Sequence, residues 1–183
     1  MKSLKGCLLV ASPYMGDPNF SRTVVLLIHH GAEGAYGVVL NRPLPATIKQ
    51  LWEKLSTNPC DIDRFVNFGG PVSGPLIALH NEKALGEARV RPGVYLAAER
   101  DHLEQLIRQT KQPLRVFVGH AGWGKGQLEV ELARGDWLTT PAKMEHIFAE
   151  DENLWTTTLR QIGRSFISSV LKLKHVPQDP SWN

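Results

Sequence analysis

The sequence has little cysteine, and what it has fits no metal-binding pattern. Of the 183 residues only Cys7 and Cys60 are cysteine, neither belongs to a CxxC pair, and no histidine or cysteine flanks them at zinc-ligand spacing. A zinc staple or a disulfide framework is therefore not expected. Two buried free thiols that act as small apolar residues are the favoured interpretation, and a single Cys7–Cys60 disulfide stays open.

Long apolar runs are missing as well. The N-terminal apolar run from Cys7 to Ala11 is interrupted by Ser12 and Pro13, so it is far shorter than the apolar region of a secretory signal or a membrane span. We therefore expect a cytoplasmic protein that has no segment in a membrane.

Charge of one sign is not concentrated anywhere in the chain. There are 21 Lys+Arg against 18 Asp+Glu, a formal net charge of +3, and the basic residues are scattered. The best basic stretch, Arg160, Arg164, Lys172 and Lys174, has no second short helix before it at helix-turn-helix spacing. A solvated helix face is the favoured interpretation, and direct nucleic-acid binding has no support in the sequence.

Apolar and charged residues occur in the proportions of an ordinary globular domain. Hydrophobic residues make up 42% and charged residues 21% of the chain, which is enough apolar material for one core. We expect a single domain over residues 1–174. The remaining residues, 175–183, contain two prolines and are expected to form a flexible tail.

Short apolar runs bounded by turn residues predict β-strands. The run Thr23–Ile28 is β-branched and almost wholly apolar, which is typical of a central strand that is covered on both faces. Tyr36–Leu40 follows a glycine-rich turn and is the expected hairpin partner of this strand. The further predicted strands are Leu8–Val10, Phe65–Phe68, Pro75–His80, Gly93–Ala97 and Leu114–Val118.

Apolar residues at helical spacing predict four helices. Ile48, Leu51, Trp52 and Leu55 share one face, with Thr47 as a plausible N-cap. The other predicted helices are Glu99–Gln109, a short one over Leu128–Leu132 that ends near Gly135, and Asp151–Leu173, which Gly163 can break or kink. Strands with interspersed helices indicate an α/β fold, with α+β left open: a mixed, largely antiparallel sheet or a flattened barrel, flanked by helices.

Two glycine-rich loops are candidates for binding an anion through backbone N–H groups. The loop that begins at Gly69 and Gly70 lacks the spacing of a nucleotide-binding loop, and a tight turn is the favoured interpretation. The loop Gly122–Gln127 is the better candidate, because it leads into a helix and carries Lys125 and Gln127. Trp123 in this loop is equally a candidate for a buried anchor.

Polar residues at turns complete the candidate site. Asp17, Asn41 and Arg42 either satisfy backbone groups in turns or face a ligand, and Arg42 is expected to pair with Asp17 or Glu129 if the fold brings them together. Of the two carboxylates of the short helix, Glu129 and Glu131, we expect Glu129 to point inward, next to the loop of Gln127. The predicted ligand-binding set is Asp17, Asn41, Arg42, Gly69, Gly70, Gly122, Trp123, Gly124, Gln127 and Glu129.

No arrangement in the sequence points to catalysis. There is no Gly-x-Ser-x-Gly elbow, neither cysteine has a histidine in its own motif, and the seven histidines show no HxH or HxxxH spacing. We therefore predict no catalytic residue, no metal and no cofactor.

Four separated motifs resemble one bacterial family. They are Gly6–Pro13 with Asp17–Phe20, Gly34–Pro43, Gly69–Val72, and Gly119–Glu129 followed by Glu131, Leu132 and Trp137. In order and content they resemble the YqgE/AlgH family, with local departures at His120 and Lys125. The resemblance implies a compact α/β protein of the bacterial cytosol, from a family often called transcriptional regulators whose biochemical activity is not established.

Two functions follow from these observations. The resemblance, together with the missing catalytic arrangement, favours a regulatory or interaction protein whose partner is another protein. The alternative is a small-molecule binder or enzyme that holds an anionic ligand in a glycine-rich pocket.

Overall fold

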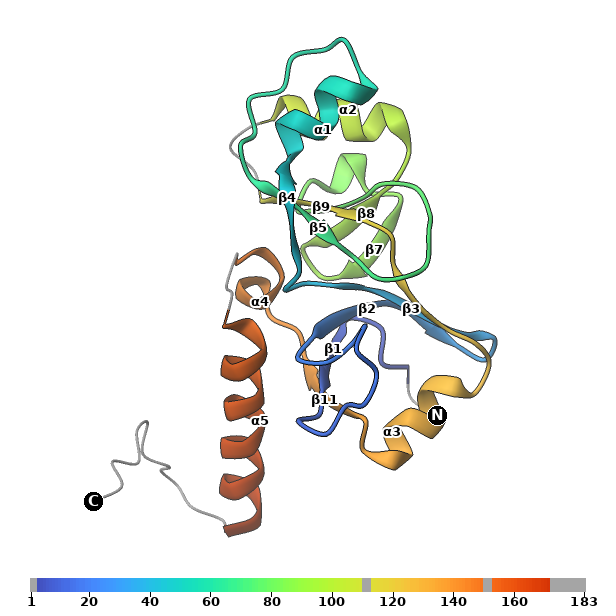
Figure 1. The fold of residues 1–183 in the computed structure, drawn as a ribbon, viewed down its shortest axis with the longest axis vertical. Helices are drawn as coiled ribbons and strands as arrows, with labels where there is room; N and C mark the ends of the chain where they lie inside the picture. Colours follow the sequence, from blue (N-terminus) through green and yellow to red (C-terminus); the bar gives the residue numbers. More distant parts are fainter. Residues whose placement is uncertain (1–2, 110–112, 150–152, 172–183) are drawn as a thin grey trace, which may run out of the picture.

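The computed structural model describes residues 3–109, 113–149 and 153–171, which form two β-sheets with helices around them (Figure 1). The first sheet has five strands, all antiparallel, in the order β10-β3-β2-β1-β11. Its strands are β1 (Cys7–Ala11), β2 (Val24–Gly31), β3 (Gly34–Val39), β10 (Ala121–Trp123) and β11 (Trp137–Pro141).

The second sheet has six strands in the order β4-β5-β9-β6-β8-β7, and only its β5–β9 pair is parallel. Its strands are β4 (Pro43–Thr47), β5 (Phe65–Phe68), β6 (Ile77–His80), β7 (Ala88–Arg91), β8 (Val94–Ala97) and β9 (Leu114–Val118). The chain enters this sheet after β3 and returns to the first sheet after β9.

Strand alternation builds a core on each face of the first sheet. In β1, Leu8 and Val10 face the core shared with the second sheet, whereas Leu9 and Ala11 face the opposite side. All four side chains are fully buried. β2 lies in the middle of its sheet and pairs with β3 as a hairpin, so both predictions made from its apolar run are confirmed.

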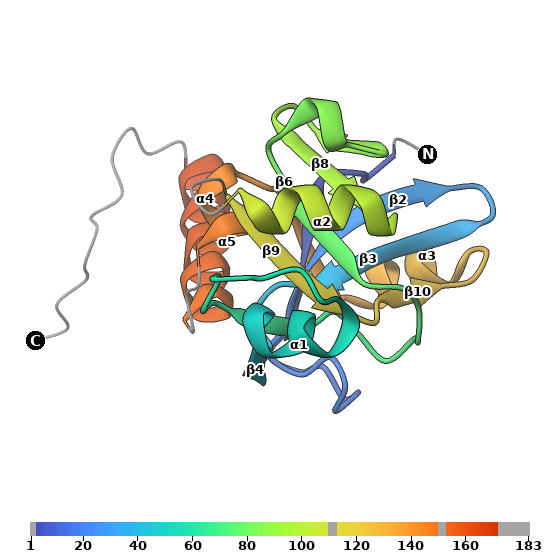
Figure 2. The ribbon, with the colours of Figure 1, turned by 90° about the horizontal axis from the view of Figure 1, so that it is seen from above.

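Helices cover the outer faces of both sheets. Helices α1 (Ile48–Leu55) and α2 (Arg100–Arg108) lie on the second sheet, with a short 3₁₀ turn η1 (Lys83–Leu85) beside them, and α3 (Gln127–Arg134) lies against the first sheet (Figures 1 and 2). The predicted N-cap of α1 is confirmed: Thr47 and Gln50 form a reciprocal capping box.

The last two helices run along one side of the sheets (Figures 1 and 2). They are α4 (Met144–Phe148) and α5 (Leu154–Leu171). The Nε1–H of Trp155 donates to the carbonyl of Ala11 at 2.7 Å, which fastens α5 to β1. Gly163 does not break α5. Asp151, Lys172, Lys174 and the predicted tail 175–183 lie outside the described residues.

A buried arginine supports the junction of the two sheets. Arg115 of β9 is 3% exposed, and its guanidinium donates to the carbonyls of Leu40 and Ile147 and to Oδ1 of Asn67. Leu40 follows β3, where the chain leaves the first sheet. The arginine therefore satisfies buried acceptors where the strand ladders end.

The predicted α/β class is confirmed, but the single sheet or flattened barrel is replaced by two sheets that do not close. The pattern missed β4, β7, β10 and β11, and each of these is an edge strand. An edge strand pairs on one side only and tolerates proline or charge, so its apolar pattern is weak. Helix α4 was missed too.

Cys60 is buried and Cys7 half-buried, and neither forms a disulfide. The expectation of two buried thiols therefore holds for Cys60, whereas Cys7 is only partly covered. Within residues 3–109, 113–149 and 153–171, no helix is both long and apolar enough to cross a membrane.

Candidate functional site

A hollow of about 320 Å³ opens between helix α3, the start of strand β11 and the turn that follows β1. Four residues of the predicted ligand-binding set, Asp17, Gly122, Trp123 and Gln127, line it although they come from two distant parts of the chain. The other lining residues are Met15, Gly16, Phe20, Glu131, Arg134, Asp136 and Trp137.

Three aromatic rings form the apolar wall of this hollow. The ring of Phe20 stacks on that of Trp123 with centroids 6.0 Å apart, and meets the ring of Trp137 edge-on at 5.5 Å. The two tryptophan rings are themselves edge-on at 5.9 Å. Trp123 and Trp137 are 5% and 3% exposed, so they anchor α3 to the sheet, and their packing fixes the shape of the hollow.

The carboxylate of Glu131 holds this wall together. Its Oε2 accepts from the Nε1–H groups of Trp123 and Trp137, both at 2.8 Å, and its Oε1 accepts from Nε2 of Gln127 at 2.9 Å. Gln127 and Glu131 are four residues apart and share a face of α3. Oε1 of Gln127 in turn accepts from the N–H of Gly124 at 3.1 Å.

Asn41 and Arg42 do not line the hollow, and their side chains hold the loop of residues 17–23 that does. Oδ1 of Asn41 accepts from the N–H of Val24, and its Nδ2 donates to the carbonyl of Arg22, both at 2.9 Å. Arg22 has a positive φ of 56°, which is rare for a side-chain-bearing residue. Arg42 donates to the carbonyls of Pro18 and Ser21, at 3.4 and 3.1 Å.

Arg42 therefore binds main-chain carbonyls rather than the carboxylate of Asp17 or Glu129. Oδ1 of Asp17 accepts from the N–H of Asn19 at 2.8 Å, which closes the turn that presents Phe20. Asp17, Asn41 and Arg42 thus all stabilise the loop, and Asp17 alone of these three also lines the hollow.

Gly69 and Gly70 lie at the junction of the two sheets. A Cβ on Gly69 would lie 2.2 Å from the carbonyl oxygen of Gly119, and one on Gly70 would lie 2.3 Å from the carbonyl carbon of His120. Gly70 also has a φ of 146°. The close approach of two main chains therefore accounts for both glycines.

Glu129 lies on the opposite side of α3 from Glu131. It is 2.9 Å from Nε2 of His30, and this hydrogen bond holds the pKa of the Glu129 carboxyl below its usual value. The expectation that Glu129 points toward the loop of Gln127 is wrong, because Glu131 occupies that position. The two side chains do point in different directions, as their spacing of two residues on a helix predicts.

Sequence reasoning missed Phe20, Glu131, Arg134, Asp136 and Trp137 as site residues. One signal was available: Gln127 and Glu131 are four apart in the sequence, next to two tryptophans that each need an acceptor for an N–H. The meeting of Phe20 with Trp137 had no local signal, because it depends on how the turn folds over the sheet.

The electrostatic character of the hollow is acidic. Asp17, Glu131 and Asp136 line it against one basic side chain, Arg134, whose Nε is 3.5 Å from Oδ2 of Asp136. Lys125, which the sequence offered as an anion ligand, lies 3.6 Å from Glu33 in an exposed ion pair. Three carboxylates against one guanidinium favour a cation in this hollow.

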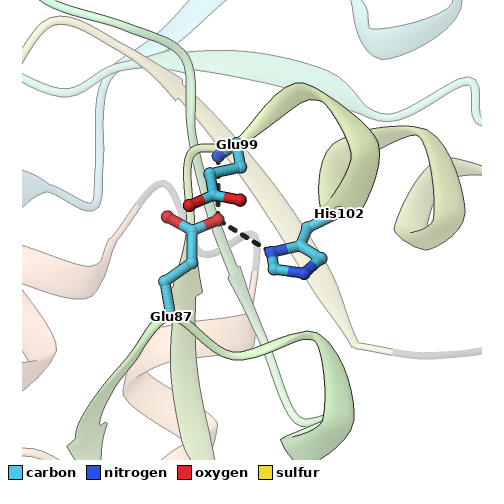
Figure 3. Close-up of side chains that lie close together, drawn as sticks. All are labelled: Glu87, Glu99 and His102. Carbon is cyan, nitrogen blue, oxygen red and sulfur yellow. Dashed lines mark hydrogen bonds and ion pairs between the residues drawn. The ribbon is translucent and has the colours of Figure 1, made fainter.

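A separate cluster could hold a metal ion. Ligand atoms of Glu87, Glu99 and His102 lie within 4.8 Å of one another, on the segment before β7 and at the start of α2 (Figure 3). The Glu87 carboxylate is already well satisfied, because its Oε1 lies 3.0 Å from Nδ1 of His102 and accepts from the N–H groups of Ala98 and Glu99. These bonds join β7 to α2 and explain the cluster without a metal.

The Glu87 carboxyl provides a test of pH dependence. Burial raises its pKa, but the hydrogen bonds from Glu99, His102 and Ala98 outweigh this, and the pKa lies below the usual 4.5. Ionised Glu87 thus stabilises the fold above the unfolded-state pKa, and the contribution is lost as the pH falls through the folded-state pKa. We expect Glu87→Gln to lower the free energy of unfolding by about 1 kcal/mol at neutral pH and to have a smaller effect at about pH 3, because the contribution of the ionised carboxylate falls with the pH.

Urea unfolding at the two pH values measures this difference, with the exposed Glu53→Gln on α1 as control. A loss for Glu87→Gln that is equal at both pH values would show that the ionised carboxylate contributes nothing.

The fold and the hollow define a class of protein: a two-sheet α/β domain with a small aromatic and acidic hollow beside a glycine-rich loop. The chain belongs to the AlgH-like family, whose model matches residues 8–167. The resemblance noted in the sequence is therefore confirmed.

Relatives and solved structures agree with this assignment. A UPF0301 protein of Myxococcus xanthus is 40% identical over 168 residues, with 89% of this chain and 93% of the relative covered, and one of Streptomyces avermitilis is 37% identical, with 100% and 97% covered. The solution structure of the AlgH protein from Pseudomonas aeruginosa matches with a TM-score of 0.75 at 29% identity, covering 96% of this chain and 97% of that one.

Proposed function

We propose that this protein is a non-enzymatic regulatory protein of the cytoplasm that binds a small organic cation in the hollow beside α3. One observation carries the proposal: the family motifs around Asp17 and around Trp123 and Gln127, more than a hundred residues apart in the sequence, line one hollow of about 320 Å³. Its volume is at the lower end of the ~300–1,000 Å³ of small-molecule sites, so it suits one small ligand.

The lining specifies the chemistry of the ligand. Asp17 and Asp136 offer carboxylates to an ammonium or guanidinium group, and Phe20, which is half-buried, offers its ring to an adjacent apolar part. Glu131 also lines the hollow and contributes negative charge, although its oxygens already accept hydrogen bonds from three donors. Arg134, at the rim, suits a ligand that also carries a carboxylate.

The charges weigh against an anion at the start of α3. Glu129 lies in the first turn of this helix, and the N–H of Gln127 already donates to the carbonyl of Gly124. An anion there would meet Glu129 and Glu131 at short range. The anionic ligand expected from the glycine spacing therefore has little support at this loop.

A bound ligand would link two parts of the surface that are distant in the sequence. Asp17 belongs to the turn held by Arg42, whereas Asp136 follows α3, so one ammonium group between them links the turn to the helix. Occupancy then changes the surface that a partner protein meets, which is how the family's regulatory label would connect to this hollow.

The test is a thermal-shift and calorimetric screen of small amines against small carboxylates and phosphates. We expect amines to raise the melting temperature of the wild-type protein, and the double variant Asp17→Asn/Asp136→Asn to bind them at least about ten-fold more weakly. Asparagine at 17 keeps the Oδ1 acceptor of the turn, so the fold is preserved.

Glu53→Gln on α1 removes one exposed carboxylate far from the hollow and serves as the control. Amine binding that the double variant retains in full, or stabilisation by anions alone that Arg134→Gln abolishes, would overturn the proposal.

A further inference from the structure

A second hollow, of about 780 Å³, lies between the N-terminal segment that leads into β1 and the edge strand β7 of the second sheet. It shares no lining residue with the hollow beside α3. Lys5, Gly6 and Cys7 line it from one side, Arg89 and Arg91 from the other, and Pro141 lies at its edge. Of the sequence motifs, only the start of Gly6–Pro13 reaches this hollow, and none of its residues was predicted to bind a ligand.

The charge of this hollow is opposite to that of the first. Lys5, Arg89 and Arg91 are basic, and among the described residues that line it there is no carboxylate. Lys5 and Arg89 are exposed, whereas Arg91 is half-buried. Three positive charges converge on one concave surface, so an anion gains from all three at once.

Arg91 has unmet hydrogen-bonding capacity. Its Nε and Nη1 are both buried, and neither has a hydrogen-bond partner within the described chain. A guanidinium stays charged at every accessible pH, and buried donors without acceptors destabilise the fold. A phosphate or carboxylate, with its forked oxygens, is the group that best satisfies a guanidinium. Because these two nitrogens are closed off from solvent, an anion in the hollow pairs with them once the side chain turns toward it.

The geometry of β7 explains why two arginines reach the same hollow. Val90 between them is 4% exposed and enters the core shared by the two sheets, so Arg89 and Arg91 both point away from that core. The pairing with β8 shifts register between them. The Pro92-Gly93 turn, with Gly93 at a φ of 76°, ends the strand directly after Arg91.

Gly6 brings the other wall close. It has a φ of 76°, and a Cβ there would lie 3.1 Å from the carbonyl oxygen of Val90 and 3.4 Å from Cβ of Arg91. The N-terminal segment therefore runs directly against β7, and Lys5 is positioned beside the arginines by the main chain rather than by a long side-chain reach.

We propose that this hollow is an anion site that takes the phosphate group of a small phosphorylated metabolite, with Arg91 as its central ligand and Lys5 and Arg89 at its rim. The anionic ligand that the sequence suggested for the glycine-rich loop finds its matching charge here. The volume exceeds what one phosphate needs, so the remainder of the metabolite lies along Gly6 and Pro141.

The experiment titrates the full chain with inorganic phosphate at constant ionic strength, followed by NMR or calorimetry and by the melting temperature. We expect phosphate to stabilise the wild-type protein more than chloride or acetate does, and Arg91→Gln to weaken phosphate binding about ten-fold or more. Arg89→Gln should weaken it less. Arg108→Gln, at the exposed end of α2, carries the same charge change and should bind as the wild type does.

A second readout separates binding from a structural role. Without phosphate, Arg91→Gln should be at least as stable as the wild type, because it removes an unsatisfied buried guanidinium. A variant that is less stable without phosphate, wild-type affinity in Arg91→Gln, or equal effects of phosphate and acetate would each overturn the proposal. None of these outcomes depends on the hollow beside α3.

Discussion

Gly70→Ala is expected to lower the free energy of unfolding by at least about 4 kcal/mol. A loss of this size is expected because the main chain itself must move to accommodate the new side chain. A Cβ there would lie 2.3 Å from the carbonyl carbon of His120 and 2.4 Å from the nitrogen of Ala121, and the φ of 146° already disfavours any side chain. Neither neighbour can turn aside, since both belong to the main chain that enters β10. Chemical denaturation followed by circular dichroism measures the loss.

Gly124→Ala is the matched control. A Cβ on Gly124 would meet nothing closer than Oε1 of Gln127 at 3.8 Å, so its stability should change by less than about 1 kcal/mol. An anion-binding role for the Gly69-Gly70 loop makes a different prediction, since Gly70→Ala would then keep its stability and lose only ligand affinity. That result would contradict the junction role assigned to the two glycines.

Glu131→Leu should destabilise the protein by about 3 kcal/mol and abolish ligand binding in the hollow. The change keeps the size of the side chain but leaves the N–H groups of two buried tryptophans without an acceptor, at roughly 1–3 kcal/mol each. Thermal and urea unfolding measure the loss, and the fluorescence of Trp123 and Trp137 reports the loosened rings.

Glu131→Gln separates the acceptor from the charge. Glutamine can still accept from both tryptophans through one oxygen, so we expect it to lose about 1 kcal/mol or less. Equal stability of Glu131→Leu and the wild type would mean that the tryptophan N–H groups find other acceptors, and the assigned role of Glu131 would be wrong.

The central strands could be predicted because their pattern is local. Thr23–Ile28 is apolar on both faces, and β2 is covered on both faces by the cores around Leu26 and Leu27. The four edge strands were missed for the converse reason. Ala88–Arg91 of β7 carries two arginines, and β4 contains Pro43 and Pro45, features that a strand paired on one side can tolerate.

The candidate site was predicted in part. The glycine-rich loop and the Asp17 turn do line one hollow, but the charge of its lining could not be predicted. Glycines and Lys125 suggested an anion, whereas the hollow is lined by the carboxylates of Asp17, Glu131 and Asp136. A local glycine motif indicates where the main chain can adopt an unusual conformation. It does not indicate which side chains from elsewhere in the chain will lie beside it.

By itself the sequence determined the α/β class, the central hairpin, the capped helix at Thr47 and the family, because alternation, helical period and capping act between residues a few positions apart. Only the tertiary structure decided the division into two sheets, the two hollows and the sign of their charge. These depend on contacts such as His30 with Glu129, 99 residues apart, and Trp155 with Ala11, 144 apart. Such contacts form only when the apolar faces are buried together, since burial acts over the whole chain and favours no particular pair of distant residues.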